Sequence, residues 1–164
     1  MIVIGLRGSI GAGKTTISKI LAQKTIITRY SFAQPIRDSL AVIGITKENN
    51  PEEYRHLAQY IGAYCRSKDP DHWVKLAKKF IANCKTDVVI DDVRYENELP
   101  LIDNLFHIKR TAVIDEIVKN PEIVKHESEN MNTKYSEDNS LGMTIYNDED
   151  IEDVVKRIIK ISGI

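Results

Sequence analysis

The sequence contains only two cysteines among 164 residues, and a chain of this length can bury a sizeable core without disulfides. Cys65 and Cys84 form neither a CxxC pair nor a zinc-binding pattern, so we expect free thiols in a reducing compartment. The apolar start, MIVIGL, ends at Arg7, which is too short for a signal peptide or a membrane span. These absences predict a soluble, cytoplasmic, single-domain protein without a membrane partner.

Net charge is also scarce, at -1, but it is unevenly distributed: residues 1–85 carry +8 and residues 86–164 carry -9. A basic half suits a polyanionic ligand, and two solvated faces whose charges compensate would give the same totals. The lysines are not interleaved with aromatics, which argues against a dedicated nucleic-acid surface. We therefore favour a small phosphorylated ligand and no nucleic-acid partner.

Apolar runs and helical spacings alternate along the chain, with no internal repeat and no low-complexity linker. Apolar or β-branched runs predict five strands, at residues 2–6, 25–32, 88–90, 106–108 and 143–146. Helical spacing and proline start signals predict helices from Lys14, Pro35, Pro51 and Pro70, and a last helix with acids at residues 148–153. This alternation predicts a three-layer α/β/α fold around a parallel sheet of about five strands.

The glycine-rich stretch from Gly8 to Thr15, GSIGAGKT, fits the pattern GxxxxGK[ST] between a predicted strand and a predicted helix. Such glycines let consecutive N–H groups surround phosphate oxygens, and the positive end of the helix points to the same place. A turn that binds nothing is the alternative, which this context disfavours. We predict a P-loop for ATP and Mg²⁺, in which Lys14 reaches the β and γ phosphates and Thr15 binds the metal. Its residues are Gly8, Ser9, Gly11, Ala12, Gly13, Lys14, Thr15 and Thr16.

Other features of the sequence narrow the class of nucleotide-binding protein. A GTPase would carry an NKxD motif, which is absent, and a motor or AAA-type ATPase would need a longer chain. The chain has instead a basic helical block at residues 34–84 and a polar segment at residues 111–140. This layout is typical of nucleoside monophosphate kinases, in which one insert holds the acceptor and the other closes as a lid.

Four short motifs resemble those of bacteriophage deoxynucleoside monophosphate kinases. They are FAQPIR (Phe32–Arg37), QYIG (Gln59–Gly62) with Arg66 and Trp73, DDVRYENE (Asp91–Glu98) and HESE (His126–Glu129). They occur in the expected order over most of the chain, and FA-x-P-x-R and D-x-R-x-x-N-E are more specific than the P-loop. The resemblance implies a P-loop kinase that transfers the γ-phosphoryl group of ATP to a deoxynucleoside monophosphate.

The same resemblance implies the phosphate-binding residues. Arg37, Arg66 and Arg94 would hold the acceptor phosphate and the transferred phosphoryl group, since a planar guanidinium binds two oxygens at once. Arg37 and Arg66 could instead be solvated helix residues, whereas Arg94 follows the carboxyl end of a central strand, where ligands bind in α/β sheets. With Lys14 and Asp92, these arginines form the predicted catalytic set.

Either of two adjacent residues at the strand end, Asp91 or Asp92, could bind magnesium. Strand alternation puts Asp92 and Arg94 on one side of the sheet and Asp91 on the other. The resemblance favours Asp92, counting from the apolar run favours Asp91, and a strand-end cap without metal is a further alternative. The predicted metal ligands are thus Thr15, Asp91 and Asp92.

The remaining site predictions concern the two bases and the lid. For the acceptor we predict Phe32, Gln59, Tyr60, Trp73 and Glu98, although aromatics at helical spacing are often core residues. The kinase layout puts the donor adenine near Arg110 and Asn147. The lid carries Lys119, Lys125 and Lys134 but no arginine, so Arg110, these lysines or the acceptor-side arginines would stabilise the transferring group.

Base preference is open, and the protein is expected to be a monomer or a homodimer. Two other functions remain: a P-loop kinase for another small phosphorylated acceptor, of the phosphomevalonate or dephospho-coenzyme A type, and a nucleotide-binding module without transfer.

Overall fold

The computed structural model describes residues 1–119 and 142–164. The chain divides into two compact units, one of Met1–Tyr30 with Cys84–Ile164 and one of Ser31–Asn83, which we call the sheet unit and the helical unit. Most of the expected lid, residues 120–140, lies outside the described residues. Over the described part of the chain, no helix is long and apolar enough to cross a membrane.

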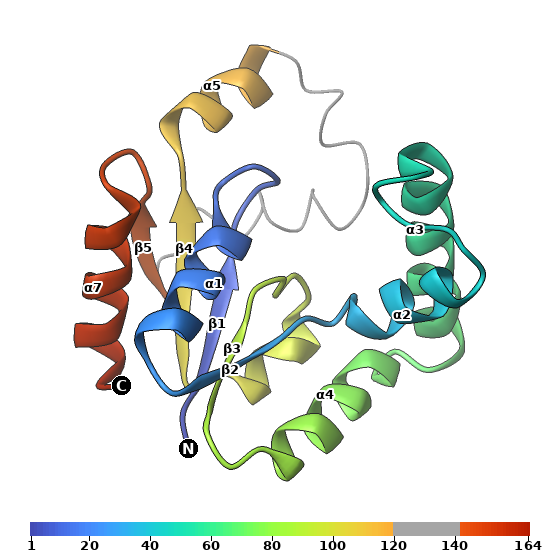
Figure 1. Cartoon of the computed structure of the whole chain (residues 1–164), viewed down its shortest axis with the longest axis horizontal. Coiled ribbons are helices and arrows are strands. Elements are labelled where there is room, and N and C mark those ends of the chain that lie inside the picture. The colour runs from blue at the N-terminus through green and yellow to red at the C-terminus, as the bar shows by residue number, and fades with distance from the viewer. Residues whose placement is uncertain (120–141) are drawn as a thin grey trace. The chain divides into compact units, whose positions relative to one another are not determined.

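All five strands of the described residues belong to the sheet unit. They are β1 (Val3–Arg7), β2 (Ile27–Tyr30), β3 (Asp87–Ile90), β4 (Asn104–Lys109) and β5 (Met143–Tyr146). Every pairing is parallel, and the order across the sheet is β2-β3-β1-β4-β5 (Figure 1). The predicted α/β fold with a parallel five-stranded sheet and flanking helices is therefore confirmed.

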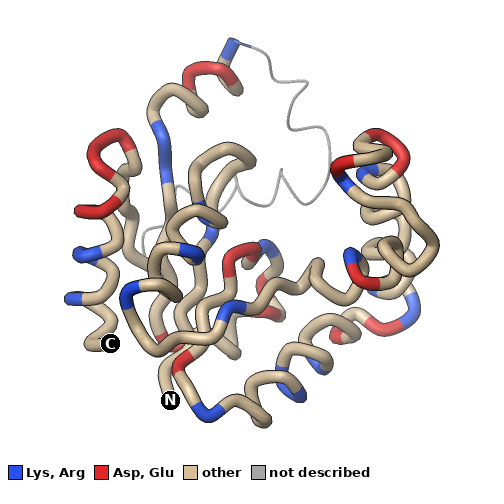
Figure 2. Tube along the Cα trace, viewed as in Figure 1, with Lys and Arg blue, Asp and Glu red and all other residues tan. Residues whose placement is uncertain are grey.

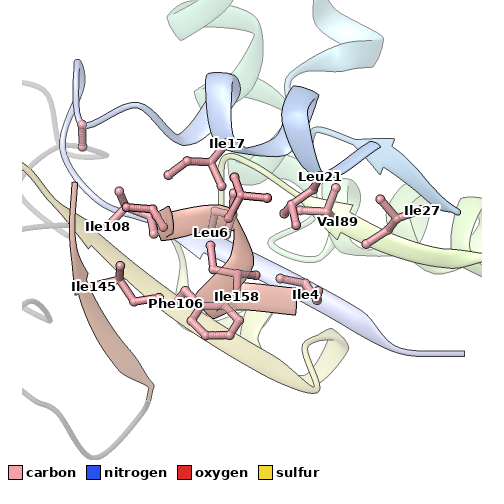
Figure 3. Packing of buried hydrophobic residues seen from close by; sticks show 13 residues of the cluster. Ile4, Leu6, Ile17, Leu21, Ile27, Val89, Phe106, Ile108, Ile145 and Ile158 are labelled. Carbon is pink, nitrogen blue, oxygen red and sulfur yellow. The ribbon is translucent and has the colours of Figure 1, made fainter. Parts of the chain in front are cut away.

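One face of the sheet is covered by α1 (Lys14–Lys24) and α7 (Ile151–Ser162). Ile4 and Leu6 of β1 point to this face, where they pack with Ile17, Leu21 and Ile158 in one buried cluster (Figure 3). All five side chains have an exposed fraction of 0%. Burying apolar side chains of this size stabilises the folded state by roughly 2 kcal/mol each, so this cluster fixes α1 against the sheet.

The opposite face of β1 carries Val3, Gly5 and Arg7, because side chains alternate along a strand. At Gly5, a Cβ would lie 2.9 Å from Ile102 Cγ2, so a larger residue there would force the Ile102 side chain to move. Ile102 follows the short 3₁₀ helix η1 (Glu96–Leu101). Arg7 is fully buried and pairs in register with His107 of β4.

Carboxylates cap the two helices near the end of β5. Asp148 accepts a hydrogen bond of 2.7 Å from the Thr111 N–H at the start of α5 (Thr111–Lys119). The Thr111 hydroxyl, first, and this N–H hold the pKa of Asp148 below its usual value. Asp150 Oδ1 accepts from Glu152 N at 2.9 Å and caps α7, as acids near a helix N-terminus should. Figure 2 shows the acids at the start of α7 and the basic residues further along it.

The helical unit consists of α2 (Gln34–Val42), α3 (Pro51–Lys68) and α4 (His72–Asn83). Prolines occupy the first turns of α2 and α3, as their start signals predict. Gly62 lies at the centre of this unit: its carbonyl accepts a hydrogen bond from Trp73 Nε1 at 3.2 Å, and a Cβ there would lie 3.6 Å from Ile36. The tightest contact of such a Cβ would be with Arg66 Nη2, at 3.3 Å, so the missing side chain leaves room for the Arg66 guanidinium.

Candidate active site

The carboxyl ends of the parallel strands bring most of the predicted nucleotide residues of the sheet unit to one edge. β1 leads into Gly8, β3 into Asp91, β4 into Arg110 and β5 into Asn147. β1 lies between β3 and β4, so the loop that follows it is flanked on both sides (Figure 1). This edge is where ligands bind in open α/β sheets.

The loop after β1 has a backbone that requires glycine. Gly8 and Gly13 have φ angles of 144° and 96°, which other residues rarely adopt. A Cβ at Gly8 would overlap the backbone oxygen of Ile108, and one at Gly13 would overlap the side-chain nitrogen of Asn147. The two glycines therefore serve both the sharp turn and the close packing of the loop on its neighbours.

Lys14 begins α1, and its side chain folds back over the loop. Its Nζ donates to the carbonyl oxygens of Gly8 at 2.6 Å and Ser9 at 2.7 Å. The ammonium group thus lies against the loop on which the sequence predicts phosphate binding. Thr15 and Thr16 follow in the first turn of α1 and are exposed, so their hydroxyl groups are accessible to a ligand.

Asn147 lies buried beside the same loop, with an exposed fraction of 8%. Its Nδ2 donates to Ala12 O at 2.9 Å, and its backbone N–H donates to Lys109 O at 2.7 Å. Arg110, predicted with it near the adenine, is exposed just before α5. The structure therefore gives Asn147 a contact with the P-loop itself, which the sequence analysis did not predict.

Asp91 points to the face that α1 covers and belongs to a closed polar triangle. Ser18 Oγ donates to Asp91 Oδ2 at 2.7 Å, Arg29 Nη2 donates to the same oxygen at 2.9 Å, and Arg29 Nε donates to Ser18 Oγ at 2.9 Å. The side chains of Asp91 and Arg29 have exposed fractions of 7% and 33%. Since Ser18 lies one turn after Thr15, this triangle ties the end of β3 to the first turns of α1.

Asp92 is half-buried next to Asp91, and its charge acts on Tyr30 at the end of β2. Burial, first, and the Asp92 carboxylate raise the pKa of Tyr30 to about 12. Both causes disfavour the phenolate, burial by desolvation and Asp92 by like-charge repulsion. The tyrosine therefore keeps its proton at physiological pH.

The D-x-R-x-x-N-E motif forms a tight turn after β3. Glu98 is almost fully buried, and its Oε2 accepts hydrogen bonds from Arg94 N at 2.7 Å and Tyr95 N at 3.0 Å. Arg7 Nη2 donates to Arg94 O at 3.2 Å. Burial lowers the pKa of Arg7, an effect that the nearby carboxylates of Glu98 and Glu96 oppose. Glu98 and Arg7 thus fix the backbone that carries the Arg94 side chain.

The predicted acceptor residues of the helical unit differ in exposure. Phe32 and Trp73 each have an exposed fraction of 6%, which favours the core interpretation of these two aromatics. Tyr60, at 62%, and Gln59 are exposed on α3. Arg37 donates from Nη2 to Gln34 Oε1 at 2.9 Å, and the Arg66 guanidinium lies over Gly62. The acceptor-binding roles of Arg37, Gln59, Tyr60 and Arg66 stay predictions.

Two further predictions concern the lid and the metal. Lys119 is exposed at the end of α5, whereas Lys125, His126 and Lys134 lie outside the described residues. Within residues 1–119 and 142–164, no group of three or more His, Cys, Asp or Glu side chains is arranged to hold a metal. Magnesium in kinases needs no such cage, because one or two carboxylates and the substrate phosphates suffice.

Sequence reasoning missed three residues that shape this edge: Arg7, Ser18 and Arg29. Arg7 ends an apolar strand immediately before the glycine loop. A charged side chain at such a position could have indicated a buried arginine with a polar partner. Ser18 and Arg29 gave no comparable sign, because polar residues in a helix and in a short strand are ordinary.

The sheet order, the glycine loop and the helix that follows it define a P-loop NTPase fold. No protein-family model matches the sequence, and a search of curated proteins gives no significant match. Solved structures do match.

Shikimate kinase from Aquifex aeolicus aligns at 15% identity with a TM-score of 0.55, covering 99% of this chain and 97% of that one. Shikimate kinase from Bacteroides thetaiotaomicron aligns at 17% identity with a TM-score of 0.53, covering 99% of both chains. A protein from Thermus thermophilus aligns at 16% identity with a TM-score of 0.52, covering 98% of this chain and 95% of that one. At such identities the likeness establishes the fold alone.

Proposed function

We propose that this protein is an ATP-dependent deoxynucleoside monophosphate kinase, which transfers the γ-phosphoryl group of ATP to the acceptor and releases ADP and the diphosphate. One structural observation carries the phosphoryl-transfer part of this proposal: β1 and β3 are neighbours in parallel register, Val3 opposite Val88 and Gly5 opposite Ile90. The P-loop after β1 and the Arg94 turn after β3 therefore lie side by side at the same sheet edge. A loop suited to phosphate binding next to a segment that carries an arginine on a held backbone fits what phosphoryl transfer requires.

The loop residues fit a nucleoside triphosphate. The loop turns at positive φ angles at Gly8, Gly11 and Gly13, and α1 begins directly after it, so the N–H groups at the start of the helix would face a bound anion with the positive helix end behind them. Lys14 adds a mobile positive charge, because the hydrogen bonds of its Nζ to Gly8 O and Ser9 O can be exchanged for bonds to phosphate oxygens. These groups would bind and orient the β and γ phosphates.

For magnesium, Thr15 and one strand-end carboxylate are the fitting donors, and the metal when bound would neutralise charge on the phosphates. We propose Asp91 rather than Asp92 for this role, because Asp91 contacts α1 at Ser18, one turn from Thr15. Asp92 follows on the alternate side of the strand. Asp91→Asn should then raise the magnesium concentration needed for half-maximal activity well above that of Asp92→Asn, and the reverse order would refute the choice.

Arg94, with Arg37 and Arg66, would hold the acceptor phosphate and the transferred group. An oxygen of the acceptor phosphate attacks the γ-phosphorus and forms the new P–O bond, while the bond from the γ-phosphorus to the β–γ bridging oxygen breaks and its electrons leave with ADP. The nucleophile is already an anion, so no protein base is required. The protein's share is to align two anions and to neutralise their charge.

The choice of a deoxynucleoside monophosphate rests on the sequence motifs, FA-x-P-x-R and D-x-R-x-x-N-E above all. Two of the similar solved structures are named shikimate kinases, which supports a small-molecule kinase in general. Shikimate must therefore be tested as an alternative acceptor. Other small phosphorylated acceptors and a non-transferring module are the remaining alternatives from the sequence.

The test is an ADP-release assay with ATP and each of dAMP, dCMP, dGMP and dTMP, with shikimate and dephospho-coenzyme A alongside. We expect turnover with at least one deoxynucleotide and none with shikimate. Turnover with shikimate or dephospho-coenzyme A alone would replace the proposal with another small-molecule kinase. If the protein binds ATP but phosphorylates none of these acceptors, the remaining interpretation is a nucleotide-binding module without transfer activity.

Lys14→Met provides the control for the site. It should abolish turnover while leaving the unfolding temperature within a few degrees of wild type. Lys19→Met is the matched variant, because Lys19 lies on the same helix and is exposed. If both variants lost activity equally, the loss in Lys14→Met could not be attributed to the position of Lys14 at the glycine loop.

A further inference from the structure

The Asn147 side chain bonds to the peptide of the P-loop that lies immediately before α1. Its Nδ2 donates to Ala12 O at 2.9 Å, between residues 135 positions apart in sequence. The carbonyl of Ala12 and the N–H of Gly13 belong to the same planar trans peptide, so they point in opposite directions. Holding the carbonyl toward Asn147 therefore aims the Gly13 N–H away from Asn147.

This peptide needs such a restraint. Gly13 has a φ angle of 96° and no side chain, so rotation of the peptide that precedes it meets little steric resistance. A rotated peptide would turn its carbonyl oxygen, with its partial negative charge, to the side where the N–H had been. On a phosphate-binding surface this exchanges an attractive group for a repulsive one.

Asn147 is itself rigidly held. Its backbone N–H donates to Lys109 O at 2.7 Å, which continues the β4–β5 pairing of Lys109 with Tyr146 by one residue. Its side chain is buried, and its amide nitrogen occupies the space that a Cβ at Gly13 would need. An amide fixed by the sheet and packed against Gly13 is a rigid support for the loop.

We propose that Asn147 is a positioning residue that keeps the Ala12–Gly13 peptide in its phosphate-binding orientation. The proposal rests on the proposed function only as far as ATP binding. It concerns the loop and not the acceptor, so a protein that binds ATP but phosphorylates no deoxynucleotide would defeat the proposed function and leave this inference standing.

The test uses the isosteric variant Asn147→Asp. Ionised, the carboxylate has no proton to donate and repels Ala12 O, whereas the protonated carboxyl group restores a donor of the same shape. Burial beside a carbonyl raises the pKa of such a carboxyl group, so protonation should be reached on moderate acidification. Asn147→Ala, which can donate at no pH, is the matched control.

ATP affinity, measured by calorimetry, should fall about tenfold in both variants near pH 8, the effect of losing one buried hydrogen bond. Near pH 5, Asn147→Asp should recover to within about threefold of wild type, while Asn147→Ala should not. The charged and titratable residues that adjoin position 147 are Asp148, Glu149 and Asp150 along the chain, Lys109, Arg110 and His107 on or after the paired strand β4, and Lys14 next to Gly13. Wild type contains all of them, so its own pH dependence is subtracted.

A second readout needs no nucleotide. In nucleotide-free Asn147→Asp, the backbone amide resonance of Gly13 should move with pH toward its wild-type position as the carboxyl group gains its proton. Thermal unfolding at each pH verifies that the variants are folded. Wild-type ATP affinity in folded Asn147→Ala, no acid recovery in folded Asn147→Asp, or a Gly13 resonance that ignores the titration would each overturn the proposal.

Discussion

The Arg29–Asp91 ion pair offers a quantitative test of the structure. Arg29 Nη2 lies 2.9 Å from Asp91 Oδ2, and Ser18 Oγ bonds to both side chains. Among the described residues, Arg29 is the only ion-pair partner of Asp91. Arg29→Met removes this positive charge and keeps much of the aliphatic part of the side chain. Asp91→Asn removes the charge and keeps the shape.

The two changes differ in cost because the two side chains differ in exposure. Arg29→Met would leave the largely buried Asp91 carboxylate, with 7% of its side chain exposed, without its ion-pair partner, so this variant should cost about 3 kcal/mol. Arg29, with 33% exposed, can turn to solvent when Asp91 is neutralised, so Asp91→Asn should cost about 2 kcal/mol. The double variant should cost much less than the sum, which gives a coupling energy of about 2 kcal/mol.

The assay is urea unfolding of the four proteins of a double-mutant cycle. The pair Lys24–Glu152 is the internal control, since it is shorter, at 2.6 Å, but its side chains are 39% and 43% exposed. Its coupling energy should stay below about 1 kcal/mol, because water competes with exposed ion pairs. If the cycle at Arg29–Asp91 gives no more coupling than that at Lys24–Glu152, the burial argument for the triangle is refuted.

Three other predictions follow from single contacts. Tyr30 should ionise with a pKa of about 12 in an ultraviolet absorbance titration. Because an unfolded tyrosine ionises near pH 10, the stability that Tyr30 contributes should be complete below about pH 10 and be lost as the pH rises through about 12. Tyr30→Phe should therefore flatten the fall of unfolding free energy in this window, and an unchanged slope would contradict the assignment. Ile158→Ala, at a fully buried position, should cost about 3 kcal/mol in chemical unfolding, and Ile161→Ala, 41% exposed on the same helix, less than about 1 kcal/mol; similar costs would mean that α7 packs by another face. Asp150→Ala removes the cap of α7 and should cost about 1 kcal/mol, and a change below the error of the unfolding assay would show that Glu152 N finds another acceptor.

Much of the fold was predictable because it depends on local patterns. The apolar runs predict the five strands, the proline start signals predict the beginnings of α2 and α3, and the GxxxxGK[ST] spacing predicts the loop between β1 and α1. The second strand is the main boundary error: residues 25–32 were expected, and β2 extends only from Ile27 to Tyr30. β-branched residues at the start of this run have high strand propensity, but pairing with β3 limits the strand to four residues.

The site was predictable in kind and less so in detail. The sequence left the choice between Asp91 and Asp92 open, and only the packing of α1 on the sheet shows that Asp91 is the one bonded to Ser18 and Arg29. By its spacing Trp73 could be a stacking surface or a core residue, and the hydrogen bond of its indole to Gly62 O favours the core of the helical unit.

The sequence alone determined the local elements and the phosphate loop, because strand alternation, helix starts and glycine spacing are set by neighbours a few residues apart. The tertiary structure decided which distant residues support that loop, above all Asn147, whose side chain bonds to Ala12 O from 135 positions away in the sequence. Such contacts depend on strand order and register, and the order β2-β3-β1-β4-β5 follows from burial across the whole sheet rather than from any short stretch of sequence.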